Sequence, residues 1–291
     1  MSSIERRPKV GVVLGGGGLK CFAAIALFEL LDEIEIEIDL LVGCSGGGLA
    51  AAARGAGFTP AEMRTLIDEF ADREIFSSVD YRTLLGLAHL PFGRFDKGAG
   101  VLKADRLRQA YQQVFKNLKL EDLHPTTLLQ TTDILTGEGV VLSQGPVADA
   151  LCATTALFPL LPPTCIKGRW LIDGAYSSLV PVMEAVNHHM DVIIVFSVST
   201  QSAANPGGFF EYFSNLINRT QIAHVRQEMA LAIDLHHHEI VIVNVPFYQD
   251  IQMWDVDKVP VILETGQKVV GQKKEEILAA IESFSVKQNG C

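Results

Sequence analysis

The chain has 291 residues, of which 48% are hydrophobic and 20% are charged, and its formal net charge at pH 7 is −10. This composition is typical of a globular protein with a large apolar core. The acidic balance and the dispersed Lys and Arg residues exclude a nucleic-acid partner, and no window contains the roughly 20 consecutive apolar residues that a membrane-spanning helix needs.

The N-terminal ten residues contain Glu5 and lack an apolar stretch of signal-peptide length, so we predict no cleaved secretion signal. An acidic chain is unsuited to permanent attachment to an anionic membrane, although a local apolar patch is able to dock on lipid. We therefore expect a cytoplasmic protein that is at most peripheral to a membrane. Its cysteines, odd in number and without a C-x-x-C pair, are typical of reduced thiols: Cys21, Cys44, Cys152, Cys165 and Cys291.

Strand-length apolar runs alternate with segments of helical periodicity along the first part of the chain. This alternation is typical of a mostly parallel sheet covered by helices on both faces, and it predicts an α/β fold. The predicted elements are a strand over 9–14, a helix over 19–33, a strand over 38–42, a helix that is opened by 50–53 and ends near Gly55 or Gly57, and a helix that begins at Thr59-Pro60.

Residues 71–103 have a looser pattern with Pro91, several glycines and scattered aromatic side chains. We predict that they form an insertion over the end of the sheet, and that this insertion is a lid. No repeat and no linker divides the chain, so we expect a single domain over residues 1–291. The other predicted elements are a strand pair over 127–143 with a turn at 136–139, strands over 169–172, 192–199 and 240–245, and helices over 209–235 and 259–284.

The sequence Gly43-Cys44-Ser45-Gly46-Gly47 fits the G-x-S-x-G pattern, directly after a predicted strand and before a helix. At such a turn the serine is exposed in a strained conformation, and the small glycines let the backbone approach a substrate. The N-terminus of the following helix favours the negative charge that the serine must develop. Ser45 is therefore the candidate nucleophile, whereas Cys44 is interpreted as a small buried residue.

Four contiguous glycines, Gly15 to Gly18, lie between the first predicted strand and its helix. Backbone N–H groups at a helix N-terminus form an anion site, which in an acyl-transfer enzyme holds the oxyanion. Two phosphate-binding alternatives each lack a required residue. A P-loop needs G-K-[ST], but Lys20 stands between Leu19 and Cys21, and a dinucleotide fingerprint needs a glycine where Cys21 stands.

Asp173-Gly174-Ala175 directly follows a predicted strand. An aspartate at this point is able to accept the Ser45 proton, although Asp-Gly alone is a common turn. A free carboxylate with a pKa near ~4 is a weak base for an alcohol, so burial must raise its affinity for the proton. The apolar residues that are near in sequence and able to provide this burial are Leu157, Phe158, Leu160 and Leu161.

With these three motifs in order, the chain resembles the patatin-like phospholipase family of serine lipid acyl hydrolases, which use a Ser-Asp dyad. The family's glycine-rich motif matches Gly15 to Lys20, its G-x-S-x-G matches Gly43 to Gly47, and its D-G-[AG] matches Asp173 to Ala175. The segment from Ala156 to Pro163, continuing to Pro181, also resembles the family. The resemblance covers about the first two thirds of the chain. It implies a patatin-like three-layer α/β/α domain with a mostly parallel central sheet and a nucleophile elbow.

The same resemblance implies Ser45 as the nucleophile and Asp173 as its base, with no metal and no organic cofactor. One departure is Cys21, which stands where the family usually has glycine. A side chain at this position is able either to tighten the start of the helix or to alter the geometry of the oxyanion donors. The implied oxyanion donors are the backbone N–H groups of Gly16, Gly17 and Gly18, and the supporting motif residues are Gly15, Lys20, Gly43, Gly47, Gly174 and Ala175.

A Ser-His-Asp triad is the alternative mechanism, because in α/β-hydrolases the histidine follows the acid in the chain. Consecutive histidines at a helix end are more often a solvated cap than a base. They are also a poor metal site, because adjacent helical side chains diverge by about 100°. The candidate histidines are His188, His189, His224, His236, His237 and His238.

We expect a carboxylic ester hydrolase in which Ser45 takes the acyl group of a lipid and water then releases it. The resemblance implies a phospholipid or lysophospholipid substrate, with transient contact to a membrane surface. The alternatives are an acyltransferase that uses the same acyl-enzyme, and a non-catalytic lipid-binding or regulatory module. Residues that could line an acyl-chain groove or a lipid-facing lip, although core packing is the commoner role, are Leu84, Leu85, Leu87, Leu90, Phe92, Phe209, Phe210, Tyr212 and Phe213.

Overall fold

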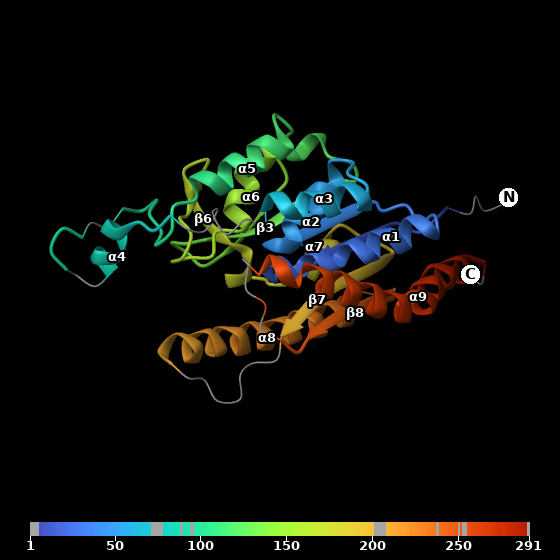
Figure 1. The fold of residues 1–291 in the computed structure, drawn as a ribbon. Helices are drawn as coiled ribbons and strands as arrows, with labels where there is room; N and C mark the ends of the chain where they lie inside the picture. Colours follow the sequence, from blue (N-terminus) through green and yellow to red (C-terminus); the bar gives the residue numbers. More distant parts are fainter. Residues whose placement is uncertain are drawn as a thin grey trace.

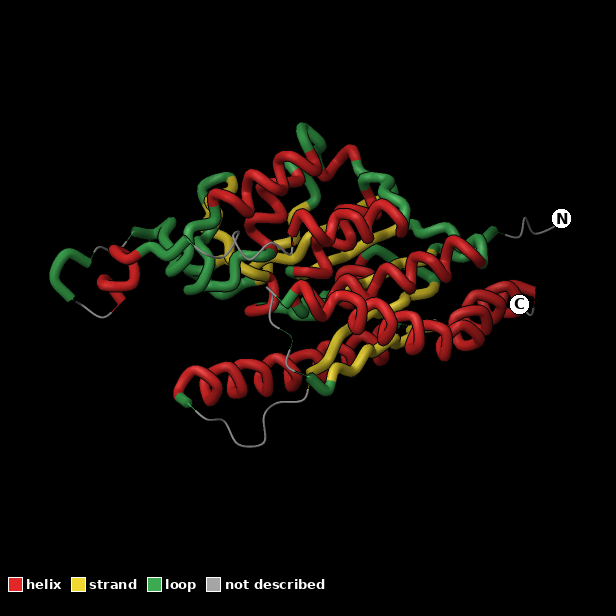
Figure 2. The backbone as a smooth tube through the Cα atoms, viewed as in Figure 1, coloured by secondary structure: helices red, strands yellow, loops and turns green. Residues whose placement is uncertain are grey.

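A three-layer α/β/α arrangement, with one sheet between two layers of helices, organises the chain (Figure 1). Figure 2, coloured by secondary structure, shows the strands running through the middle of the molecule with helices outside them. Among the helices of the described ranges, none combines the length and apolar character needed to span a bilayer. The computed structural model describes residues 6–70, 78–87, 90–93, 96–200, 208–236, 239–249, 251 and 255–289.

The sheet has the strand order β5-β6-β3-β2-β1-β7-β8, and β4 pairs with β3 beside this path. Strands β1, β2, β3, β7 and β8 pair in parallel, whereas β4, β5 and β6 are joined through antiparallel pairs. The prediction of a mostly parallel sheet is confirmed. The strands span Val10–Leu14 (β1), Leu40–Cys44 (β2), Thr126–Asp133 (β3), Gly139–Leu142 (β4), Thr164–Ile166 (β5), Arg169–Asp173 (β6), Val192–Thr200 (β7) and Glu239–Phe247 (β8).

Helices cover both faces of the sheet, and short 3-10 helices (η) join several of them. The helices span Gly18–Ala24 (η1), Ile25–Glu33 (α1), Gly46–Gly55 (α2), Pro60–Phe70 (α3), Tyr81–Leu87 (α4), Asp105–Phe115 (α5), Leu120–Asp122 (η3), Val147–Thr154 (α6), Gly174–Tyr176 (η4), Val182–Asn187 (α7), Phe209–Leu235 (α8), Val256–Lys258 (η5) and Val259–Asn289 (α9).

Two apolar cores lie on opposite faces of the sheet. Side chains alternate between the faces of a strand, so Val12 and Leu14 of β1 enter one core and Val13 enters the other. The larger core packs against α1, α2, α3, α5, α6 and α9, and the smaller core packs against α7 and α8. Strands that are buried on both faces explain the continuous apolar runs in the sequence.

The register of the strands brings three distant segments together at one edge of the sheet. Leu14 pairs with Gly43, so the loops that follow β1 and β2 leave the sheet side by side. Cys44 pairs with Gln130 of β3, and the next residue of β3, Thr131, pairs with Asp173 of β6. The chain positions after β1, β2 and β6 are therefore neighbours in space.

The predicted elements differ from the observed ones in several places. Strand β2 runs over Leu40–Cys44 and not over 38–42, because Gly43 and Cys44 are small, buried residues that continue the strand. Helix α2 begins at Gly46, several residues before the prediction, and the predicted helix over 19–33 is divided into η1 and α1. Helices α5 and α6 and strand β5 were not predicted.

The predicted insertion over 71–103 contains helix α4, which projects away from the body of the molecule in Figure 1. Its base is held by a bridge between Val79 and Leu102 and by backbone hydrogen bonds from Val101 and Leu102 to the carbonyl oxygens of Pro159 and Leu160, at 2.9 and 2.8 Å. Residues 71–77, 88–89 and 94–95 lie outside the described residues. A role as a lid stays a prediction.

Candidate active site

Ser45 occupies the turn between β2 and α2 in a strained backbone conformation, with φ 53° and ψ −125°. A non-glycine residue with positive φ costs about 1–3 kcal/mol and persists only where its surroundings hold it. Here the backbone N–H of Ser45 donates to the Thr154 hydroxyl at 2.9 Å, and that hydroxyl donates to the Gln130 carbonyl oxygen at 2.6 Å. Helix α6 and strand β3 thus hold the elbow in place.

Gly47 lets the elbow pack directly on the backbone of the loop that follows β1. A Cβ atom at Gly47 would lie 2.4 Å from the carbonyl oxygens of both Leu14 and Gly15, which is far inside van der Waals contact. The two loops therefore touch backbone to backbone. This contact explains why a helix starts at three glycines, although glycine is a poor helix former.

Replacing Gly47 with alanine is expected to lower the free energy of unfolding by about 1–3 kcal/mol, because rigid backbone has to move to admit the methyl group. Urea denaturation of the purified variant measures the change. Gly271→Ala is the matched control, since Gly271 lies on α9 and a Cβ atom there would meet no atom within 4 Å, so that alanine is expected to stabilise slightly. Equal stability changes in the two variants would contradict the packing argument.

Asp173 ends β6 beside the elbow, and its side chain is 2% exposed. Its Oδ2 atom accepts a hydrogen bond from the Ser45 hydroxyl at 2.7 Å. Its Oδ1 atom accepts from the backbone N–H of Ala175 at 2.9 Å and from the thiol of Cys44 at 3.8 Å. The carboxyl group is thus oriented from both sides, with one oxygen directed at the candidate nucleophile.

Gly174 allows Asp173 to approach this close to β3. A Cβ atom at Gly174 would lie 2.4 Å from the carbonyl oxygen of Gln130, so no larger residue fits without a shift of the backbone. The hydroxyl of Thr132 adds a hydrogen bond to the Asp173 carbonyl oxygen at 3.0 Å. Both contacts fix the D-G-[AG] motif against the central strand.

Burial raises the pKa of Asp173 from its ordinary value of 3.8 to about 6, against the opposing effects of the hydrogen bonds from Ala175, Ser45 and Cys44. Desolvation disfavours a charged carboxylate, so the group holds a proton more tightly than it does in water. At neutral pH it is still ionised, but it is a stronger base than a free aspartate. This is the property that a carboxylate needs to take a proton from a hydroxyl.

The glycine loop lies beside Ser45, since a Cβ atom on Gly16 would be 3.3 Å from the Cβ of Ser45. The N–H of Gly15 donates to the Phe196 carbonyl oxygen at 2.8 Å, and the N–H of Gly16 donates to the Leu179 carbonyl oxygen at 2.9 Å. The Gly16 N–H, predicted as an oxyanion donor, is therefore engaged in the fold. The N–H groups of Gly17 and Gly18 make no such backbone bond within the described chain, and the oxyanion proposal rests on these two.

Cys21, which stands at the family's usual glycine position, is 2% exposed and packs between the glycine loop and the elbow. Its thiol donates to the Gly15 carbonyl oxygen at 3.3 Å, and its sulfur would lie 3.1 Å from a Cβ atom at Gly46. Burial raises the pKa of this thiol to about 12, so it stays neutral. Cys21 thus links the two loops. Lys20 extends away, with its Nζ 3.4 Å from the Ile251 carbonyl oxygen.

The Ser45 hydroxyl meets a carboxylate here, where a triad would need a histidine. His188, His189 and His224 are exposed, and the Nδ1 atom of His188 is 2.8 Å from the Glu184 carbonyl oxygen of its own helix. His237 and His238 lie outside the described residues. Within the described ranges, no three His, Cys, Asp or Glu side chains are grouped so as to hold a metal ion.

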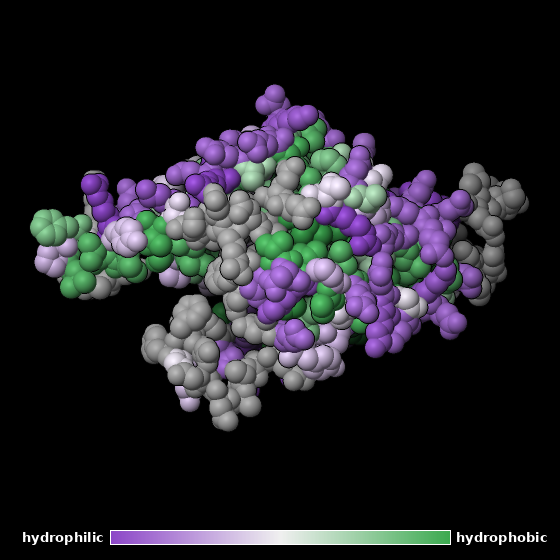
Figure 3. All heavy atoms as spheres, viewed as in Figure 1, coloured by the Kyte–Doolittle hydropathy of each residue, from purple (hydrophilic) through white to green (hydrophobic). Residues whose placement is uncertain are grey.

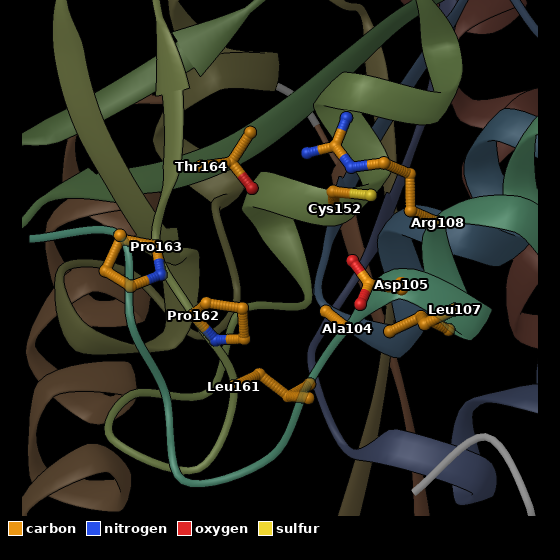
Figure 4. Close-up of a pocket in the computed structure, with 10 residues that line it drawn as sticks. Ala104, Asp105, Leu107, Arg108, Cys152, Leu161, Pro162, Pro163 and Thr164 are labelled. Carbon is orange, nitrogen blue, oxygen red and sulfur yellow. The ribbon is translucent and has the colours of Figure 1, made fainter. Parts of the chain in front are cut away.

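A cavity of about 200 Å³ lies between α5, α6 and the segment that leads into β5 (Figure 4). Its wall is partly polar, with Asp105 and Arg108 from α5 and Thr164 from β5, and Cys152 of α6 forms part of the same wall. Neither Ser45 nor Asp173 lines this cavity. It is thus separate from the pair of side chains that carries the candidate chemistry.

Two residues of the site were not predicted to act there. Thr154 contacts the elbow from 109 positions away, and Cys44 contacts the base from the variable position of the motif. A hydroxyl at the C-terminal end of α6, after the apolar residues 150–153, is the only trace of the first contact in the sequence. The second leaves none, because a buried cysteine is usually a packing residue.

A serine at a strand-to-helix turn, beside a glycine loop and on a three-layer α/β/α fold, defines the class of α/β proteins with a nucleophile elbow. Residues 12–186 match the model of the family described as patatin-like phospholipase, and the chain belongs to this family. The resemblance seen in the three sequence motifs is confirmed.

Curated relatives cover most of this chain but are longer. An NTE family protein of Mycobacterium tuberculosis is 26% identical over 218 residues, which are 73% of this chain and 57% of that protein. The lysophospholipase NTE1 of Coccidioides immitis is 31% identical over 219 residues, which are 72% of this chain and 13% of that protein. The chain thus spans little more than half the length of the mycobacterial relative and about an eighth of the length of the fungal relative.

The fold is also shared with a solved structure. The crystal structure of VipD from Legionella pneumophila superposes with a TM-score of 0.54 at 13% sequence identity, covering 93% of this chain and 67% of that chain. At this identity the likeness shows the fold alone. It agrees with the α/β/α architecture described above.

Proposed function

We propose that this protein is a serine lipid acyl hydrolase that cleaves a carboxylic ester of a phospholipid or lysophospholipid. Ser45 is the nucleophile and Asp173 is its base. The observation that carries the proposal is the 2.7 Å hydrogen bond between the Ser45 hydroxyl and Oδ2 of a buried carboxylate whose pKa is raised to about 6. The lysophospholipase name of the relative from Coccidioides immitis supports the substrate class.

In the first half of the reaction, Asp173 takes the hydroxyl proton as the Ser45 oxygen attacks the ester carbonyl carbon. The tetrahedral intermediate carries a negative oxygen, which the N–H groups of Gly17 and Gly18 stabilise together with the N-terminus of α2. Collapse breaks the ester bond, and the leaving alcohol receives the proton from Asp173. The acyl group stays on Ser45.

In the second half, Asp173 takes a proton from water, and the resulting hydroxide attacks the acyl-enzyme carbonyl. Breaking the bond to Ser45 releases the fatty acid and returns the proton to the serine oxygen. No metal or organic cofactor takes part in this scheme. The experiment that tests the function is an assay with radiolabelled phospholipid and lysophospholipid, in which fatty acid release must depend on Ser45.

We propose that the apolar tip of the insertion over 71–103 contacts the surface of a phospholipid membrane. We define the tip by four exposed side chains, and Figure 3 shows hydrophobic atoms gathered on this projection. The exposed cations Arg82, Lys97 and Lys103 lie on the same insertion, whereas the whole chain is acidic. Apolar side chains flanked by cations suit the surface of a phospholipid bilayer. The tip residues are Tyr81, Leu84, Leu90 and Phe92, of which Phe92 is 92% exposed.

Replacing Phe92 with serine is expected to weaken binding to phosphatidylcholine vesicles about tenfold, because the apolar transfer energy of the ring is lost. Co-sedimentation with vesicles measures the binding, and hydrolysis of a water-soluble short-chain ester is expected to stay unchanged. Leu135→Ser is the matched control, since Leu135 is also exposed but lies in the turn between β3 and β4. Equal loss of vesicle binding in both variants would argue against the tip as the docking surface.

A further inference from the structure

Cys44 is the last residue of β2, and its side chain reaches the same carboxyl group as the Ser45 hydroxyl. It is fully buried, and its sulfur lies 3.8 Å from Oδ1 of Asp173. The sulfur would also lie 3.5 Å from a Cβ atom at Gly16. Cys44 therefore fills the space between the glycine loop and the base.

The donors around Asp173 are divided between its two oxygens. Oδ1 accepts from the Ala175 N–H and the Cys44 thiol, and Oδ2 accepts from the Ser45 hydroxyl. We propose that Cys44 is a positioning residue, whose thiol donates to Oδ1 and so keeps Oδ2 turned toward Ser45. This inference rests on the proposed role of Asp173 as the base.

A thiol suits this position because it donates weakly and does not ionise there. Burial, and after it the nearby charge of Asp173, raise the pKa of Cys44 well above its ordinary value. The side chain thus remains a neutral donor and does not add a second negative charge beside the base. A hydrogen bond to the carboxylate lowers its pKa, and a weak donor lowers it less than a strong donor does. Asp173 therefore keeps more of its affinity for a proton.

Other titratable groups act on this pair from several elements, so the pH response has to be separated from theirs. Burial raises the pKa of Cys21 to about 12 and also raises the pKa of Tyr111, so both groups stay neutral near pH 6. Tyr176 also stays neutral there, with its pKa raised to about 12, first by burial. Glu228 of α8 has its pKa raised by burial and acts on Cys44. These four residues are the same in the wild type and in the Cys44 variants. A difference between their Asp173 titrations is therefore assigned to the side chain at position 44.

The test is the titration of the Asp173 carboxyl carbon, followed by NMR on the full chain labelled with ¹³C-aspartate. Asp173→Asn identifies the signal by its disappearance. In Cys44→Ala one of the two donors to Oδ1 is lost, so the carboxylate is less stabilised and its titration is expected to move to higher pH. Cys44→Ser keeps a donor on the same Cβ and is expected to return the titration toward that of the wild type.

Cys152→Ala is the matched control, because Cys152 is another buried thiol but lies on α6 and lines the separate cavity. It is expected to leave the titration of Asp173 in place. The proposal is overturned if Cys44→Ala leaves the titration unchanged, or if Cys152→Ala moves it equally. It is also overturned if Cys44→Ser moves it upward as far as Cys44→Ala does.

Hydrolysis provides the second readout and separates this proposal from the proposed function. Cys44→Ala is expected to lower kcat/KM on the high-pH plateau about two- to tenfold and to move the acid limb of the profile to higher pH, with KM little changed. The NMR titration reports on the contact even in a protein without turnover. An upward shift without any Ser45-dependent hydrolysis would therefore support the contact and refute the function, and normal hydrolysis without a shift would do the reverse.

Discussion

Ser45→Ala is expected to lower the release of fatty acid from phospholipid or lysophospholipid by about 10³-fold or more. The nucleophile and its base act together, so removing the nucleophile abolishes nearly all of their joint contribution to the rate. The backbone contact between Ser45 and Thr154 does not depend on the hydroxyl, so the elbow is expected to keep its conformation. The variant should bind lipid and fail to form an acyl-enzyme.

Labelling with a fluorophosphonate probe measures the nucleophile directly, and only the wild-type chain is expected to be labelled at Ser45. Ser143→Ala is the matched control, because Ser143 is exposed after β4 and takes no part in the site. Thermal unfolding shows whether each variant is folded. An unlabelled wild-type chain that binds lipid would favour a non-catalytic module, and wild-type turnover in Ser45→Ala would refute the assignment.

The same assay distinguishes a hydrolase from an acyltransferase. Both use the acyl-enzyme on Ser45, but a transferase passes the acyl group to a second alcohol in place of water. With labelled lipid and an added acceptor, a hydrolase is expected to release mainly free fatty acid. A new acylated product that depends on Ser45 would favour the alternative.

Much of this fold follows from local features of the sequence. Strand β1 and the first half of β7 are apolar runs that are buried on both faces, and β8 alternates between buried and less buried residues. The helices predicted over 209–235 and 259–284 are found as α8 and α9. The start of α2 at Gly46 was missed because glycine has a low helix propensity, which the contact of Gly47 with the carbonyl oxygens of Leu14 and Gly15 overrides. The first residue of α2 is therefore set by tertiary packing and not by helix propensity.

The site was predicted where motifs mark it and missed where only contacts do. Ser45 and Asp173 stand in recognisable motifs, and the structure brings them within 2.7 Å. The N–H of Gly16 donates to the Leu179 carbonyl oxygen because the chain after the Asp173 motif passes beside the glycine loop. No local sequence pattern predicts this long-range contact. The single-domain interpretation and the catalytic roles stay predictions.

Asp173→Asn is expected to abolish hydrolysis to about the same extent as Ser45→Ala, because an amide cannot accept the hydroxyl proton. In the wild type, turnover is expected to fall as the pH drops through about 6, where the buried carboxylate becomes protonated. The asparagine side chain has nearly the same shape, and its oxygen can still accept from Ala175. A pH profile without an acid limb near this value would contradict the role of Asp173 as base.

The same substitution is expected to stabilise the fold, by about 1–3 kcal/mol at pH 8. The pKa of Asp173 is raised in the folded chain to about 6 from 3.8, so the stability gained by protonation is fully present below about pH 3.8 and is lost as the pH rises through about 6. Asparagine is neutral throughout, so the difference from wild type should shrink as the pH falls. Urea denaturation at pH 8 and pH 5 measures it.

Asp133→Asn is the contrasting control for this stability change, since the Arg169 guanidinium lowers the pKa of Asp133 and the loss of that carboxylate should destabilise the fold at pH 8. The two aspartates therefore respond with opposite signs, because one is ionised against desolvation and the other is ionised beside a cation. A stability loss in Asp173→Asn at pH 8 would mean that the ionised carboxylate supports the fold, and it would refute the prediction that this substitution stabilises the protein.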